Sequence, residues 1–308
     1  MNDYLKEVLD DIYSIADDSR EEFNKGYDKI INILQDSFTR NGIDVSKFYI
    51  YPVGEYDYGT SIEDLAPYKI IFEYSCKKED VVKKINYLKD SGKKGVKAQL
   101  MMRAVTQDVL STYTNLEIAE MIENIIKSSN FNIGTTIKQN SVFARIIDNE
   151  KEYNYVIIVA YKFSDDEYLR FKYKGQNVKL NYDKYCENFA KKNDATDGIY
   201  ADVVVLYKYF EFALLLDEQI DYKTLTEFNL YENLLYNVPN KLFSNDRYLT
   251  IKNTVNYLSN VDVEQLKTVD DVCMADNKFE KEILKQYIYK ITNNAILFDK
   301  SMEYDDID

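Results

Sequence analysis

The residues best placed to do chemistry lie in residues 53–74, VGEYDYGTSIEDLAPYKIIFEY, between two apolar stretches. Gly54 begins a turn after the first stretch, and Thr60 places a hydroxyl in the connector that follows. Backbone amides of a glycine turn can hold a triphosphate, and an Asp-x-Asp pair on the next strand would bind Mg²⁺ beside it. Residues 65–71, where such a pair would fall, read LAPYKII without one acidic residue. The stretch therefore has the layout of a phosphate-and-metal site without its metal ligands.

Other carboxylates near this stretch leave a second interpretation open. Asp57 and Asp64 lie in the connector, and Glu73 stands four residues beyond Lys69 on the same face of the expected strand. These three could form a relocated Mg²⁺ site, or they are solvated acids in a chain with 53 Asp and Glu residues. Glu55 beside a triphosphate would be repulsive by several kcal/mol in a partly desolvated site. This repulsion predicts weak or absent nucleotide binding.

The composition excludes several classes of enzyme. The chain has no histidine, so Ser-His and Cys-His nucleophile pairs, a histidine general base and histidine metal ligands are all excluded. Its three cysteines, Cys76, Cys186 and Cys273, are widely spaced and never form a C-x-x-C pair. Neither a disulfide framework nor a zinc site is therefore expected.

The charge and hydropathy patterns bear on partners and location. A net charge of −14 argues against a protein that wraps nucleic acid, because such affinity comes from Lys and Arg. Lys93, Lys94 and Lys97 form either a solvated loop or a contact for nucleic acid or an acidic partner. No run of 18 apolar residues and no signal-peptide pattern is present, so we expect no membrane association and a cytoplasmic location.

Hydrophobic periodicity predicts an α+β protein with a mixed sheet followed by a helical lobe. We expect two domains, residues 1–182 and residues 183–308. The expected strands are 48–53, 68–74, 142–147, 153–163 and 168–173. The expected helices are two within 4–41, then 99–110, 116–127, 185–192, 198–217, 227–236, 246–258 and 278–298.

Four further segments, in order along the chain, resemble one family. They are residues 125–147, 153–163, 182–212 and 228–243. The last, FNLYENLLYNVPNKLF, is the most specific, because an Asn-Val-Pro after an amphipathic helix seldom recurs by chance. Its matching residues are Glu232, Asn237, Val238, Pro239 and Phe243. The chain is similar to the bacterial cGAS/DncV-like (oligoadenylate-synthetase-like) nucleotidyltransferases of the DNA polymerase beta superfamily, which implies a nucleotidyltransferase fold.

Departures from the family pattern imply a degenerate member. The family's third catalytic Asp would fall at Val156 or Ile157, both apolar. Without carboxylates, two-metal nucleotidyl transfer is not expected. The resemblance then implies a catalytically inactive binding, scaffold or regulatory module with a protein partner, in a bacterial antiphage or toxin system. The alternative is an active metal-dependent transferase with relocated ligands, making a nucleotide product or modifying a protein.

One basic position of the family pattern is retained. Lys208 matches the lysine that the family uses on its long helix to meet nucleotide phosphate, so Gly54, Thr60 and Lys208 are the candidate nucleotide-binding residues. The alternative is a lysine that pairs with Glu211 or Glu232, or that extends to solvent.

Overall fold

The computed structural model describes residues 1–54, 59–60, 67–76, 114–129, 133–138, 140–148, 151–173, 176–216, 228–275 and 277–305. The chain divides into two compact units. The helical unit comprises Met1–Ser19, Gly54–Ala66 and Tyr182–Asp308, and the sheet unit comprises Arg20–Val53 and Pro67–Asn181. The division predicted at residues 1–182 and 183–308 stays a prediction, and the predicted helix 99–110 lies outside the described residues.

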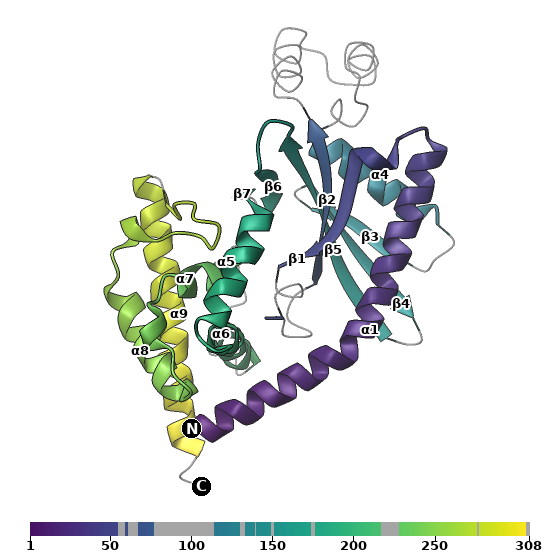
Figure 1. Cartoon of the computed structure of the whole chain (residues 1–308). Coiled ribbons are helices and arrows are strands. Elements are labelled where there is room, and N and C mark those ends of the chain that lie inside the picture. Colours follow the sequence, from purple (N-terminus) through teal and green to yellow (C-terminus); the bar gives the residue numbers. More distant parts are fainter. Residues whose placement is uncertain are drawn as a thin grey trace. The chain divides into compact units, whose positions relative to one another are not determined.

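The sheet unit contains a mixed β-sheet (Figure 1). Its strands are β1 (Phe48–Val53), β2 (Tyr68–Cys76), β3 (Ile133–Lys138), β4 (Ser141–Asp148), β5 (Lys151–Phe163), β6 (Leu169–Tyr173) and β7 (Gln176–Leu180). The order is β1-β2-β5-β4-β3, and β6 pairs with both β5 and β7. Only the β2 and β5 pair is parallel among these pairings. The predicted mixed sheet is confirmed, but β3 and β7 were missed because polar residues dominate both.

One face of the sheet packs against helices α1 (Asn2–Arg40) and α4 (Asn115–Lys127) (Figure 1). Phe23 of α1 contacts the rings of Tyr68 and Tyr155, at centroid distances of 4.5 and 5.6 Å. Asn115 donates from Nδ2 to the Val159 carbonyl, 2.8 Å away, and accepts from the Tyr74 hydroxyl. Helices α1 and α4 therefore cover this face of the sheet through aromatic contacts and these two hydrogen bonds.

Helix α1 is continuous, so the prediction of two helices within residues 4–41 is wrong. Gly26 does not break it, because a single glycine in a helix costs only about 1 kcal/mol relative to alanine. The helix ends as predicted at Asn41 and Gly42, where Gly42 has φ +74°. The amides of Gly42 and Ile43 bond the carbonyls of Thr39 and Phe38, in the pattern of a Schellman cap.

The helical unit is built around α6 (Ile199–Leu216). The other helices are α5 (Tyr182–Asp194), α7 (Leu230–Tyr236), α8 (Arg247–Asn260) and α9 (Lys278–Asp305), all of which contact α6. Helix α6 is apolar around most of its circumference, which is typical of a helix surrounded by others. The predicted C-terminal helical region is confirmed. In the described residues, no helix has the length and apolar character needed to cross a membrane.

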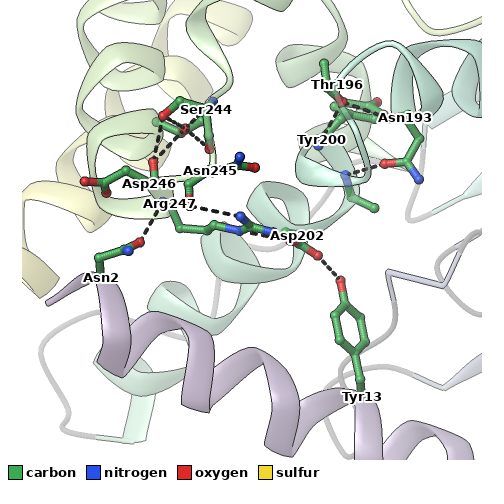
Figure 2. Close-up of polar contacts among 12 residues, drawn as sticks. Asn2, Tyr13, Asn193, Thr196, Tyr200, Asp202, Ser244, Asn245, Asp246 and Arg247 are labelled. Atoms are coloured by element: carbon green, nitrogen blue, oxygen red, sulfur yellow. Dashed lines mark hydrogen bonds and ion pairs between the residues drawn. The ribbon is translucent and has the colours of Figure 1, made fainter.

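A polar network ties the first turns of α1 to α6 and α8 within the helical unit (Figure 2). The Tyr13 hydroxyl donates to Asp202, 2.8 Å away, and Arg247 forms an ion pair with the same carboxylate at 2.6 Å. The Arg247 amide donates to the Asn2 side chain at 2.8 Å. Burial and, after it, the Asp202 charge raise the pKa of Tyr13, so its phenol keeps the proton that it donates.

Gly26 generates a stability prediction, because a Cβ at this position would lie 2.1 Å from the Tyr155 hydroxyl oxygen. Tyr155 is fully buried and its hydroxyl donates to the Phe23 carbonyl at 3.1 Å, so it cannot easily yield. Gly26→Ala should therefore lower the free energy of unfolding by about 1–3 kcal/mol, although Ala is the better helix former. Adding Tyr155→Phe should recover part of the loss in denaturant titrations. A Gly26→Ala variant more stable than the parent would contradict this packing.

Candidate functional site

The register of β2 against β5 shows which side chains lie together where the motif would place its carboxylates. Tyr68 pairs with Tyr155, and both lie on the face that α1 covers. Lys69 pairs with Val156 on the opposite face, and Ile71 follows on that face two residues later. The face that is not committed to α1 therefore carries Lys, Ile and Val at these positions. None of these side chains can ligate Mg²⁺.

Lys69 places a buried cation in this arrangement. Its side chain is only 5% exposed, and its ammonium lies 5.8 Å from the centroid of the Tyr173 ring, close enough for a cation–π interaction. Lys69 also pairs with Val53, the last residue of β1. A lysine here supplies no ligand for a divalent cation, where a catalytic carboxylate would supply one.

Glu73 lies on the same strand face as Lys69 and Ile71, but further along β2. Four residues at about 3.3 Å each place it about 13 Å from Lys69. Its Oε2 accepts a hydrogen bond from the Tyr51 hydroxyl at 2.6 Å. Glu73 is therefore hydrogen-bonded to a residue of β1 and lies well away from Lys69 along β2.

The remaining candidates for a relocated metal site or a basic patch fall outside the described residues. They are Asp57, Asp64, Lys93, Lys94 and Lys97. Glu55 and Ser61 of the connector also lie outside. Within the described ranges, no group of three or more Asp, Glu or Cys side chains is arranged to hold a metal ion.

The three candidate nucleotide-binding residues all belong to the helical unit. Gly54 has φ +81°, a conformation that glycine adopts without strain. Lys208 of α6 donates to the Thr60 carbonyl at 3.0 Å and to its hydroxyl at 3.2 Å. The same ammonium forms an ion pair with Oε1 of Glu232 on α7 at 2.6 Å, and the Thr60 hydroxyl donates to that oxygen at 2.9 Å. Of the alternatives drawn from the sequence, the structure shows Lys208 paired with Glu232.

The Thr60–Lys208–Glu232 cluster is almost completely removed from water. Thr60 and Glu232 are 0% exposed and Lys208 is 8% exposed. The Tyr200 hydroxyl donates to the Glu232 carbonyl at 2.7 Å and holds the α7 backbone in place. Oε2 of Glu232 has no hydrogen-bond partner in the part of the chain that the structure describes. The cluster is an ammonium and a hydroxyl that together hold a carboxylate, which is the chemistry of an oxyanion site.

A third buried lysine, Lys192, which the sequence analysis missed, bonds to the Asn-Val-Pro segment. Lys192 of α5 donates to the Val238 carbonyl and, at 2.6 Å, to Oδ1 of Asn240. Its ammonium lies 5.0 Å from the centroid of the Phe243 ring. Burial lowers the pKa of Lys192 to about 8. No sequence motif marks Lys192, because its partners are a backbone carbonyl and side chains about 50 residues away.

A family model matches part of the chain. Residues 187–294 match the cGAS/DncV-like nucleotidyltransferase C-terminal helical domain. This match confirms the predicted resemblance over these residues, which are similar to the helical domain of the cGAS/DncV-like nucleotidyltransferases. No curated protein gives a significant match.

Solved structures share the fold at low sequence identity. Elizabethkingia meningoseptica CdnE cyclic dinucleotide synthase is 17% identical, with a TM-score of 0.62 over 88% of this chain and 90% of that chain. Rhodothermus marinus CdnE c-UMP-AMP synthase is 16% identical, with a TM-score of 0.55 over 87% and 90%. E. coli MS115-1 CdnC, in a complex with HORMA-deltaN, is 14% identical, with a TM-score of 0.56 over 91% and 82%. These likenesses confirm the nucleotidyltransferase fold.

The buried ion pair predicts strong coupling between Lys208 and Glu232. Lys208→Met should lower the free energy of unfolding by about 3–5 kcal/mol, because it leaves a carboxylate buried without its counter-ion. Glu232→Gln should destabilise for the reciprocal reason. The double variant should lose much less than the sum of the two in denaturant titrations. Additive losses would show that the two charges are not paired.

Lys192 predicts a pH dependence of stability. Its ordinary pKa is 10.5, so between pH 8 and 10.5 the unfolded chain holds a proton that the folded chain has released. The free energy of unfolding should therefore rise with pH across this window, which is the sign expected for a lowered lysine pKa. Melting temperatures of the parent and Lys192→Met measured from pH 7.5 to 9.5 isolate this contribution. Parallel curves would contradict it.

Proposed function

We propose that this chain is a catalytically inactive nucleotidyltransferase-like protein that acts by binding. The observation that carries the proposal is the group of Lys69, Ile71 and Val156, which are buried on the face of β2 and β5 that α1 does not cover. A two-metal transfer needs carboxylates there to hold both ions and to activate the attacking hydroxyl. A buried ammonium and two apolar side chains can do neither.

We further propose that nucleotide binding is weak or absent and independent of metal cofactors. Lys208, the lysine available for phosphate, already neutralises Glu232 at 2.6 Å, so an incoming phosphate must compete with that carboxylate. The chain's net charge of −14 opposes phosphate-bearing ligands and nucleic acid in general. Gly54 and Thr60 retain the turn and the hydroxyl, but their role here is structural.

The binding function that fits these features is that of a scaffold, regulator or heteromeric subunit with a protein partner. One solved relative of the fold, E. coli CdnC, is seen in a complex with a HORMA protein, which supports the choice of a protein partner over a small substrate. We place the protein in the bacterial cytoplasm, in an antiphage or toxin system. This assignment rests on the family relationship of residues 187–294.

The test is incubation of the pure protein with all ribo- and deoxynucleoside triphosphates and Mg²⁺ or Mn²⁺, followed by mass spectrometry of protein and small molecules. We expect no oligonucleotide, cyclic product or nucleotidylated protein, because no carboxylate pair is available at β2 and β5. The matched control is Glu73→Ala, which removes the described carboxylate of the relocated site. A product made by the parent and lost in Glu73→Ala would overturn the proposal and establish relocated catalysis.

A further inference from the structure

The outer edge of β3 is an unprotected edge of the sheet. β3 is the last strand in the order β1-β2-β5-β4-β3, and no other described strand pairs with its far side. Residues 133–137, IGTTI, contain neither a proline nor a charged residue, and the exposed Lys138 ends the strand. An edge strand of this kind presents free backbone amides and carbonyls with which another strand can pair.

The opposite edge of the same sheet is protected. The edge strand there, β1, contains Pro52, which has no backbone amide to offer to a further strand. The Ile50 carbonyl of β1 accepts a hydrogen bond from the Tyr27 hydroxyl of α1 at 3.0 Å. A proline and a covering helix both prevent a sheet from growing at its edge, and the described residues provide neither at β3.

The register of β3 against β4 indicates which β3 residues face the free edge. Lys138 pairs with Ser141 across a tight turn, in which Asn140 has the positive φ, +66°, that such turns use. The pair that closes the turn is hydrogen-bonded, and such pairs alternate with pairs whose amides and carbonyls face away from the partner strand. Thr135 and Ile137 therefore direct their backbone groups toward the free edge.

Thr135 also has a side-chain atom without a partner. It pairs with Ala144 of β4, which pairs in turn with Tyr155 of β5, so its side chain lies on the sheet face that α1 and α4 cover. Its Oγ1 is buried and has no hydrogen-bond partner among the described residues. An unsatisfied buried hydroxyl is costly, and on an edge strand it points to a neighbour that the single chain does not supply.

We propose that β3 is a dimerisation edge: the β3 strands of two copies of this chain pair antiparallel about Thr135 and join the two sheets into one. A two-fold axis between the Thr135 residues places Ile137 of each copy opposite Ile133 of the other, so that the outward amides and carbonyls of both strands pair. The two Thr135 hydroxyls then lie opposite each other on the same face, where one can donate to the other.

The occupant of the edge is a second copy rather than an unrelated strand, because the symmetry itself places a hydroxyl opposite the unsatisfied one of Thr135. The antiparallel arrangement also keeps the Lys138 residues of the two copies at opposite ends of the pairing, so their charges do not meet. The inference concerns the edge of the sheet and does not depend on the proposed loss of catalysis.

The experiment is sedimentation equilibrium of the parent and its variants. One pair of short strands is a small interface, so the dimer should dissociate with a constant on the order of 10 µM. Thr135→Pro removes an amide that faces away from β4, so it should keep the fold of the single chain and lose the dimer. A parent that stays monomeric, whether its edge is bare or occupied by another protein, would overturn the proposal. A dimer that survives Thr135→Pro would overturn it as well.

A matched pair of variants tests the position of the axis. Thr135→Val keeps the branched side chain but removes the hydroxyl, so it should weaken the dimer about two- to tenfold. Thr136→Val makes the same change on the exposed opposite face and should leave the dissociation constant unchanged. Equal dissociation constants for the two variants would contradict pairing about Thr135.

Amide hydrogen exchange of the parent keeps the proposal testable if Thr135→Pro does not fold. The amides of Thr135 and Ile137 should exchange fast in dilute protein and become protected as the concentration rises through the dissociation constant. The amides of β1, at the opposite edge, serve as the control and should show no dependence on concentration. Exchange at Thr135 and Ile137 that is independent of concentration would overturn the proposal.

Discussion

The helical unit depends on one ion pair that is removed from water. Taking an ammonium and a carboxylate out of water costs several kcal/mol per ion. Their attraction offsets this desolvation penalty only when the geometry is good and further hydrogen bonds satisfy the remaining donors and acceptors. Lys208 and Glu232 meet at 2.6 Å, Thr60 adds a hydroxyl and a carbonyl, and Tyr200 secures the backbone of α7. This pair joins α6 to α7, and Thr60 bonds to both of its members. The same atoms are those that a phosphate would require.

The sheet unit has the architecture of a nucleotidyltransferase, and the side chains of Lys69, Ile71 and Val156 on β2 and β5 are an ammonium and two apolar groups. Because α1 and α4 occupy one face of the sheet, catalytic side chains of β2 and β5 would have to lie on the other face. There, Lys69 lies beside Val156 and beneath the Tyr173 ring. The strands do not need catalytic carboxylates in order to pair, since their register is set by backbone bonds and by apolar side chains such as Ile71 and Ile158. The fold can therefore be retained after the reaction is lost, as we propose for this chain.

The sequence predicted most of the fold, because long apolar patterns and the Asn-Val-Pro segment are local. It predicted β1, β2, β4, β5, β6 and the helices of the C-terminal region, but missed β3 and β7, which contain few large apolar residues. It divided α1 wrongly: the helix runs unbroken from Asn2 to Arg40, because one glycine within a helix costs only about 1 kcal/mol relative to alanine. For the site, it offered Glu232 among the partners of Lys208 but could not choose, because that choice depends on how α6 and α7 pack. Lys192, whose partners are far along the chain, was not predicted at all.

The central claim is that this nucleotidyltransferase fold has lost its metal-dependent chemistry. Calorimetric titration of the parent protein with ATP, once with Mg²⁺ and once in EDTA, tests it most directly. A working two-metal site binds the nucleotide through the ions, so its affinity depends strongly on them. Because Lys69, Ile71 and Val156 offer no carboxylate on these strands, ATP should bind weakly in both titrations, and no more tightly with Mg²⁺. A tight complex that forms only with Mg²⁺ would contradict the claim.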